Sequence, residues 1–234
     1  GTVLNTNQPM NITNQFNLAE VEKIIDVELG EYHSVALTNT GRVFTWGENE
    51  IGQLGNMSTT DLYVPTELPA SDFGSEGVVS ITVYDKMNAA MTASGRLFTW
   101  GFNWHGELGD GTEVHKLVPT EVTGNFGLAV DETIEKISFG LYHTALITSA
   151  GRLFTWGNNS YGELGTGTTS IVPTLIPTEL SLSNFGGHPI VDVSAGYHTT
   201  AVVTDTGKLY TWGLNNVGQL GHGTTTNSSV PVEV

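Results

Sequence analysis

One pattern constrains the fold of this chain more than any other, because the pair Trp-Gly recurs at nearly constant spacing. The pair occurs four times, 54, 56 and 56 residues apart, beginning at Trp46, Trp100, Trp156 and Trp212. An Asn follows three residues after each Trp, and a Gly-(Gln/Glu)-Leu-Gly tetrad closes each copy, at 52–55, 106–109, 162–165 and 218–221. A period of this length indicates a tandem array in which each repeat is one supersecondary unit.

Each period predicts short antiparallel strands and no helix. Turn-bounded apolar segments predict strands near 34–38, 42–46, 88–92, 96–100, 144–148, 152–156, 200–204 and 208–212. The segment 200–204 is nearly continuous in apolar residues, which predicts burial on both faces. A proline-bearing strand and a further strand complete each period. A four-stranded sheet of this kind must stack against a neighbour. The chain is thus predicted to be all-β.

We expect a single repeat domain over 1–234. Its repeats fall at about 9–64, 65–118, 119–176 and 177–230, with 231–234 starting a further repeat. The segment 33–55, HSVALTNTGRVFTWGENEIGQLG, resembles the repeat of the regulator of chromosome condensation family, and the chain looks like a bacterial-type member or a fragment of one. The resemblance implies β-propeller blades of four antiparallel strands, normally seven in a closed ring.

Two copies depart from the Gly-x-Tyr-His opening of the motif. The second has Tyr84-Asp85-Lys86-Met87 in place of residues 30–33, and in the fourth His198 stands one place early, which predicts a bulge or an altered turn. His33, His143 and His198 could in principle form a ring of metal ligands or general bases. Because Met87 stands in the second copy, a structural imidazole at a strand start, bonded to the backbone of a neighbouring loop, is the favoured interpretation.

The strand count bears on assembly. The proline-bearing strand occurs five times, at 9–13, 65–68, 119–122, 177–180 and 231–234, whereas the other strands occur four times. A surplus strand leaves a sheet edge or blade face uncovered, and proteins cover such surfaces by closure or pairing. The sequence therefore predicts self-association as a two-fold dimer. A compact monomer that excludes one terminal strand is the competing outcome.

The charge balance narrows the classes of partner. The chain carries 24 acidic residues against 8 Lys and Arg, a net charge of −16, so binding to nucleic acid or to an anionic membrane is not expected. Without cysteine it has no thiol chemistry. No apolar run is long enough to span a membrane and no signal peptide opens the chain. The Thr-, Asn- and Gly-rich character favours an extracellular or bacterial cell-surface location over the cytoplasm.

No motif for catalysis is present. The chain has no nucleophile elbow, phosphate-binding loop or dinucleotide fingerprint. Glu107 and Glu163 stand where the other copies have Gln53 and Gln219, which indicates an exchangeable polar position. We therefore expect no enzymatic activity, no cofactor and no metal.

Trp104 breaks the repeat, because the other copies have Glu50, Ser160 and Asn216 at its position. An aromatic residue in a variable loop is a candidate for protein binding, although local packing on Phe102 is an equal alternative. The predicted protein-binding residues are Trp104, His105, Tyr161, Glu50 and Ile51. The predicted function is a protein-interaction scaffold that binds a protein partner or another copy through its blade loops. The alternatives are a structural repeat segment of a bacterial surface protein and a carbohydrate-binding or hydrolytic surface that uses the acidic loops.

Overall fold

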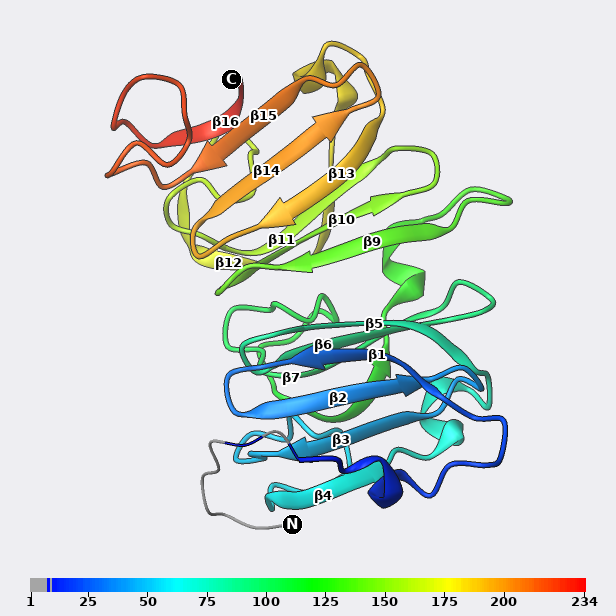
Figure 1. Cartoon of the computed structure of the whole chain (residues 1–234). Helices are drawn as coiled ribbons and strands as arrows, with labels where there is room; N and C mark the ends of the chain where they lie inside the picture. The colour runs from blue at the N-terminus through cyan, green and yellow to red at the C-terminus, as the bar shows by residue number, and fades with distance from the viewer. Residues whose placement is uncertain (1–7, 9) are drawn as a thin grey trace. The chain divides into compact units, whose positions relative to one another are not determined.

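The computed structural model describes residue 8 and residues 10–234, and it is built of strands (Figure 1). The only helices in this part of the chain are four short 3-10 turns: η1 (Thr13–Phe16), η2 (Ala70–Phe73), η3 (Thr123–Phe126) and η4 (Leu182–Phe185). All eight strands that the sequence predicted are present, so the all-β prediction is confirmed.

The strands form four sheets, each of four antiparallel strands joined in chain order. We call each sheet a blade. Blade 1 contains β1 (Ile24–Leu29), β2 (His33–Thr38), β3 (Val43–Gly47) and β4 (Leu62–Glu67). Blade 2 contains β5 (Val78–Tyr84), β6 (Met87–Thr92), β7 (Leu97–Gly101) and β8 (Lys116–Glu121). Blade 3 contains β9 (Ile134–Phe139), β10 (His143–Thr148), β11 (Leu153–Asn159) and β12 (Ser170–Leu180). Blade 4 contains β13 (Ile190–Ala195), β14 (Thr199–Thr204), β15 (Leu209–Gly213) and β16 (Ser228–Glu233).

The blades are offset by one strand from the sequence repeats. The prolines at 65, 119, 177 and 231 lie in β4, β8, β12 and β16, the last strand of each blade. The segment 231–234 therefore completes blade 4. In the fifth proline-bearing segment, 9–13, Pro9 lies outside the described residues, residues 10–12 form no strand, and Thr13 begins η1. The surplus strand expected from the sequence is therefore not formed in the described residues.

The chain divides into two compact units. Unit 1 holds blades 1 and 2, with residues up to Phe102 and His115–Glu121, and unit 2 holds blades 3 and 4, with Asn103–Val114 and Val122–Val234. The loop 103–114, which leaves β7, thus belongs to unit 2.

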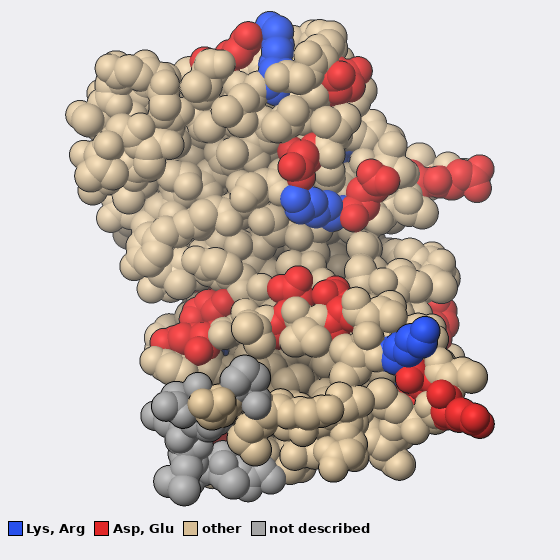
Figure 2. Space-filling model, in the orientation of Figure 1, with Lys and Arg blue, Asp and Glu red and all other residues tan. Residues whose placement is uncertain are grey.

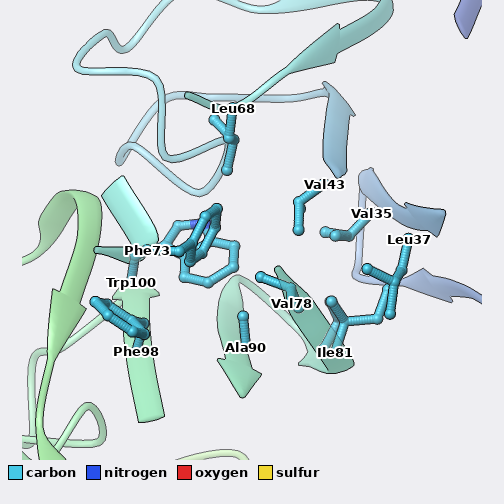
Figure 3. Packing of buried hydrophobic residues seen from close by; sticks show 11 residues of the cluster. Val35, Leu37, Val43, Leu68, Phe73, Val78, Ile81, Ala90, Phe98 and Trp100 are labelled. Atoms are coloured by element: carbon cyan, nitrogen blue, oxygen red, sulfur yellow. The ribbon is translucent and has the colours of Figure 1, made fainter. Parts of the chain in front are cut away.

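Within each unit, the aliphatic face of the first blade packs on the aromatic face of the second. In unit 1, Val35, Leu37 and Val43 lie in one core with Phe98 and Trp100 of blade 2 and with Phe73 of η2 (Figure 3). The ring of Phe73 meets those of Phe98 and Trp100 at 5.7 and 6.1 Å between centroids. The equivalent residues of unit 2 are Ala145, Ile147 and Leu153 on blade 3, Tyr210 and Trp212 on blade 4, and Phe185 of η4. Alternate residues of β10 or β14 thus serve opposite faces of one blade.

In the described residues, one blade face remains open and another is covered in part by η1. On blade 4, Ala201, Val203 and Leu209 occupy the register positions of Val35, Leu37 and Val43 but are half-buried or exposed. Burial along β14 consequently alternates, and the prediction that 200–204 is buried on both faces is wrong, whereas β10 is buried throughout. On blade 1, Phe44 and half-buried Trp46 of the aromatic face contact Phe16.

Candidate functional site

The loop that follows each Trp-Gly pair is held by its Asn. In the copy of unit 2 that begins with Asn103, the side-chain Oδ1 accepts the Leu108 N–H at 2.9 Å, and Nδ2 donates to the carbonyls of Thr112 and Val114 at 2.9 and 3.1 Å. Asn49 and Asn215 make the corresponding three bonds, and Asn159 binds the Leu164 N–H and the Thr168 carbonyl. The buried amide replaces strand pairing as the partner of the loop backbone, which gives a long loop a fixed shape.

The Trp of the following blade fastens this loop. Trp156 Nε1 donates to the Glu107 carbonyl at 2.8 Å, and Trp212 Nε1 donates to the Glu163 carbonyl at 2.7 Å. Gly109 lies against Trp156, where a Cβ would come within 2.9 Å of Nε1, and its φ of +73° also favours glycine. The spacing between the tetrad and the next Trp therefore records a contact between consecutive repeats.

His33 and His143 have structural roles at the start of β2 and β10. His33 Nε2 lies 2.7 Å from Asn88 Oδ1, and His143 Nε2 lies 2.9 Å from Thr200 Oγ1. The expected bond to a loop backbone is indirect, because Thr200 and Asn88 in turn donate to the carbonyls of Glu163 and Gln53. The Nδ1 atoms of both rings are buried without a hydrogen-bond partner in the described residues. Burial lowers the pKa of His143 to about 4 and also lowers that of His33.

His198 does not belong to this set. The turn before β14 spans three residues, 196–198, as do the turns at 30–32 and 140–142, so the predicted bulge or altered turn length is absent. Thr199 occupies the register position of His143, and His198 that of Tyr142, because Thr199 and His143 both pair with the glycine of a Trp-Gly pair. His198 therefore lies in the turn before β14, where its side chain contributes to the surface of unit 2.

Five aromatic and imidazole rings gather where the turns before β10 and β14 meet the loops of unit 2. Tyr142 lies between His105 and His198, with ring centroids 4.8 and 5.7 Å away. Tyr161 and Tyr197 lie 4.8 and 4.7 Å from His198. We call His105, Tyr142, Tyr161, Tyr197 and His198 the aromatic patch. Tyr197 is 61% exposed and Tyr161 is 39% exposed, so the rings form part of the surface.

Two fully buried carboxylates support the patch. Glu163 Oε1 lies 2.8 Å from His198 Nδ1, and its Oε2 accepts the Tyr161 N–H at 2.8 Å. Glu107 binds His105 in the same two ways, at 3.0 Å to Nδ1 and 2.8 Å to the backbone N–H. The Glu107 hydrogen bond raises the pKa of His105. Because a carboxylate only accepts, the Nδ1–H of each histidine is the donor in its hydrogen bond.

The corresponding end of unit 1 is charged instead. Lys86 occupies the register position of Tyr142, and its Nζ lies 2.9 Å from Glu48 and 3.9 Å from Glu31. Gln53, at the position of Glu107, donates from Nε2 to Glu48 at 2.9 Å. Figure 2 shows Asp and Glu atoms at this end of unit 1, whereas the loop after β15 in unit 2 shows no charged atoms.

The predicted site residues are distributed over both units. Trp104 is 66% exposed and precedes His105 of the patch, and Tyr161 belongs to the patch. Glu50, which is exposed, and Ile51, which is half-buried, hold the equivalent loop positions in unit 1. Sequence reasoning missed Tyr142 and Tyr197, and it gave His198 a structural role. The signal was the residue just before the second strand of each blade, which is Tyr, Lys, Tyr and His in the four copies.

In the described residues, no three His, Asp or Glu side chains are grouped so that they could hold a metal ion. No helix there has the length and apolar character needed to cross a membrane.

Comparison with known proteins gives consistent matches over nearly the whole chain. Residues 2–234 match the sequence profile of the RCC1-like domain. The ultraviolet-B receptor UVR8 of Arabidopsis thaliana is 36% identical over 213 residues, which cover 91% of this chain and 46% of the receptor. A probable human E3 ubiquitin-protein ligase, HERC4, is 34% identical over 221 residues, covering 93% of this chain and 20% of the ligase.

Solved structures show the same fold. Human WBSCR16 superposes with a TM-score of 0.78 at 26% identity, covering 91% of this chain and 53% of that one. Yeast RCC1 (Prp20), solved with Kap60 bound, superposes with a TM-score of 0.76 at 22% identity, covering 93% and 50%. The chain thus spans about half the length of these proteins and of the receptor, and a fifth of the ligase.

Proposed function

This chain belongs to the RCC1-like domain family, and from that premise we propose that it is a non-catalytic protein-interaction module that binds a protein partner through the blade loops of unit 2. Proteins of this family are mainly binders or exchange factors. Two of the similar solved structures concern binding: yeast RCC1 with Kap60, and Prp20p with its binding to Gsp1p and histones. The family gives no support to the surface-segment or carbohydrate alternatives.

The observation that carries the proposal is the aromatic patch with Trp104 beside it. Tyr and Trp are enriched at the centres of protein interfaces because they offer a large, rigid contact area and a polar atom. Trp100, Trp156 and Trp212 are fully buried, whereas Trp104 is exposed, so Trp104 is the tryptophan of these four that a partner can reach.

Affinity capture with a matched control tests this proposal. Wild-type chain, Trp104→Ala and Tyr32→Ala would be immobilised and exposed to the proteome of the source organism, with quantification by mass spectrometry. We expect at least one protein to be enriched on wild type and on Tyr32→Ala but reduced at least fivefold on Trp104→Ala. A proteome in which no protein distinguishes Trp104→Ala from wild type would contradict the proposal.

A second candidate is self-association, which the open face of blade 4 and the partly covered face of blade 1 favour. On the aromatic face of blade 1, Phe44 is buried in contact with Phe16 and Trp46 is half-buried, whereas the open aliphatic face of blade 4 presents Ala201, Val203 and Leu209. These are the two kinds of face that pack together inside each unit. The loops after Trp-Gly favour the same contact, because the loop of blade 4 exposes a position that is buried in the other three copies. Gln219 is exposed, whereas its equivalents Gln53, Glu107 and Glu163 are fully buried.

We propose that blade 4 of one copy covers blade 1 of another, in a two-fold dimer that repeats this contact twice. Light scattering at micromolar concentration should give twice the 25.0 kDa of one chain. Leu209→Glu, which places a charge on the aliphatic face, should return the mass to one chain. The control Ile171→Glu, at a side chain that is 89% exposed, should not. A wild-type mass of one chain that does not change with concentration would contradict the dimer.

A further inference from the structure

We infer that the aromatic patch binds an arginine side chain from a basic segment of the protein partner. This inference rests on the proposed function and names the chemistry that the partner presents.

The rings of the patch are arranged to receive a planar cation. A guanidinium group is attracted to the face of an aromatic ring and stacks on it, and several rings around one point form an aromatic cage for a cation. Tyr142, Tyr161 and Tyr197 lie around His198, with ring centroids between 4.7 and 5.7 Å from it. Three tyrosines in contact with one imidazole offer several ring faces within the reach of one planar group.

The charge around the patch also favours a cation. Glu107 and Glu163 lie directly beneath the rings and bind histidines of the patch, not Lys or Arg. Glu113 also acts on His105 from the same loop, since its charge contributes to the raised pKa of that histidine. The segments that build this end of unit 2 contain no Lys or Arg: 103–114, 140–142, 157–169, 196–198 and 213–227. The patch therefore combines aromatic faces with carboxylates and contains no Lys or Arg of its own.

Unit 1 shows what happens when the chain does supply one. At the register position of Tyr142, Lys86 places its ammonium 2.9 Å from Glu48 and 3.9 Å from Glu31. The hydrogen bond to Glu48 raises the pKa of Lys86. The same position of the blade thus holds an internal cation in unit 1 and an aromatic ring in unit 2, where the cation would come from outside.

Arginine fits this surface better than lysine, because its guanidinium is planar and weakly hydrated and can stack on rings while it donates hydrogen bonds. A second copy of the chain does not fit through this same patch. It would bring the acidic residues and the Lys- and Arg-free loops of one copy against those of the other, and like charges facing each other oppose association. The occupant is therefore a basic protein segment.

Calorimetric titration with three blocked peptides tests the inference: Gly-Arg-Gly-Arg-Gly, the same peptide with Lys, and the same peptide with citrulline, which keeps the shape of arginine without its charge. We expect saturable binding of the Arg peptide to wild type, binding about tenfold weaker for the Lys peptide, and no measurable binding for citrulline. Tyr161→Ala/Tyr197→Ala should weaken Arg-peptide binding at least tenfold. The exposed Tyr32→Ala of unit 1 should leave it unchanged.

Two results would overturn the inference: equal binding of the Arg and citrulline peptides, or equal binding of the Arg peptide to wild type and to a folded double tyrosine variant, with folding checked by near-ultraviolet circular dichroism. Affinity capture with the same variants distinguishes a failure of the arginine assignment from a failure of the proposed function. If the tyrosine pair is dispensable for capture while Trp104→Ala abolishes it, the interaction module stands and the arginine assignment is wrong.

Discussion

The two units share the framework of the loops after Trp-Gly and differ most in the side chains that these loops carry at the surface. In both, an Asn holds the loop after Trp-Gly, and the side chain at Trp+7 accepts the N–H at Trp+5, as Gln53 does from Ile51 and Glu163 from Tyr161. On this shared frame, Gln53, Glu48 and Lys86 of unit 1 bind one another in a row. Unit 2 instead carries the aromatic patch, whose histidines bind Glu107 and Glu163.

This comparison separates two kinds of repeat position. The Asn after Trp-Gly, whose side chain holds loop carbonyls and an amide, is the same in every copy, because the loop backbone that it satisfies is the same. Residues that point from this frame to solvent vary without altering it. At Trp+7, the exchange of Gln for Glu changes the side-chain hydrogen-bond partner. Gln53 of unit 1 binds the carboxylate of Glu48, whereas Glu107 and Glu163 of unit 2 each bind a histidine. The surface of each unit is thus set independently of its fold.

The largest expected effect tests whether the frame is shared. Trp100→Ala in unit 1 and Trp156→Ala in unit 2 should each lower the free energy of unfolding by about 3–5 kcal/mol, because each removes a fully buried ring and its hydrogen bond to the preceding loop. Trp104→Ala should change it by less than about 1 kcal/mol. Urea denaturation measures all three. If Trp104→Ala is as destabilising as Trp156→Ala, Trp104 is a core residue.

The next effect concerns pH and the buried His143. Its folded-state pKa of about 4 lies below the 6.5 of a free imidazole, so the unfolded chain takes up a proton first as the pH falls. Stability is therefore lost between pH 6.5 and about 4, by about 3 kcal/mol in total. His143→Thr, which copies Thr199 of blade 4, should remove this part of the loss.

Unfolding free energies at pH 7 and pH 4.5 for wild type and His143→Thr provide the measurement. His33 should show a change in the same direction, because burial also lowers its pKa. If the free energy of unfolding falls by the same amount between the two pH values in wild type and in His143→Thr, folding does not lower the pKa of His143.

The smallest expected change in the free energy of unfolding belongs to a variant that should gain a binding site. Lys86→Tyr gives unit 1 the residue that unit 2 has at Tyr142 and removes the internal cation from Glu48 and Glu31. Because these ion pairs are partly exposed, the free energy of unfolding should change by no more than about 1 kcal/mol. Calorimetry should then find a second, weaker site for the Arg peptide. An unchanged stoichiometry would show that the frame and its acids do not suffice for binding.

Much of the framework could be predicted from the sequence, because it is recorded in spacing. The Trp-Gly period, the Asn and the tetrad each correspond to a contact that every copy makes, such as Trp156 to the Glu107 carbonyl. Strand positions followed from turn-bounded apolar alternation. The offset of the blade by one strand could not be read this way, because a tandem period has no intrinsic starting point. For the same reason, the fifth proline-bearing segment looked like a surplus strand.

The patch was only partly predictable. Trp104, His105 and Tyr161 were found because they break the loop pattern. Tyr142 and Tyr197 were missed because they stand in turns distant in sequence from those loops. The sequence showed that His198 stands one place early, but only the pairing of Thr199 with Gly213 shows that the turn keeps its length and that His198 takes the position of Tyr142. Proximity across two blades is a tertiary property that a single period does not contain.

The most direct test of the account is a map of Arg-peptide binding on the wild-type chain by amide chemical shifts. The account predicts saturable shifts at residues 104–105, 142, 161 and 197–198 of unit 2. It predicts no comparable shifts at residues 31–32, 50–51 and 86 of unit 1, where Lys86 already holds the acids. Equal shifts at the two sets would show that binding follows acidity alone, and shifts confined to unit 1 would contradict the assignment of the patch.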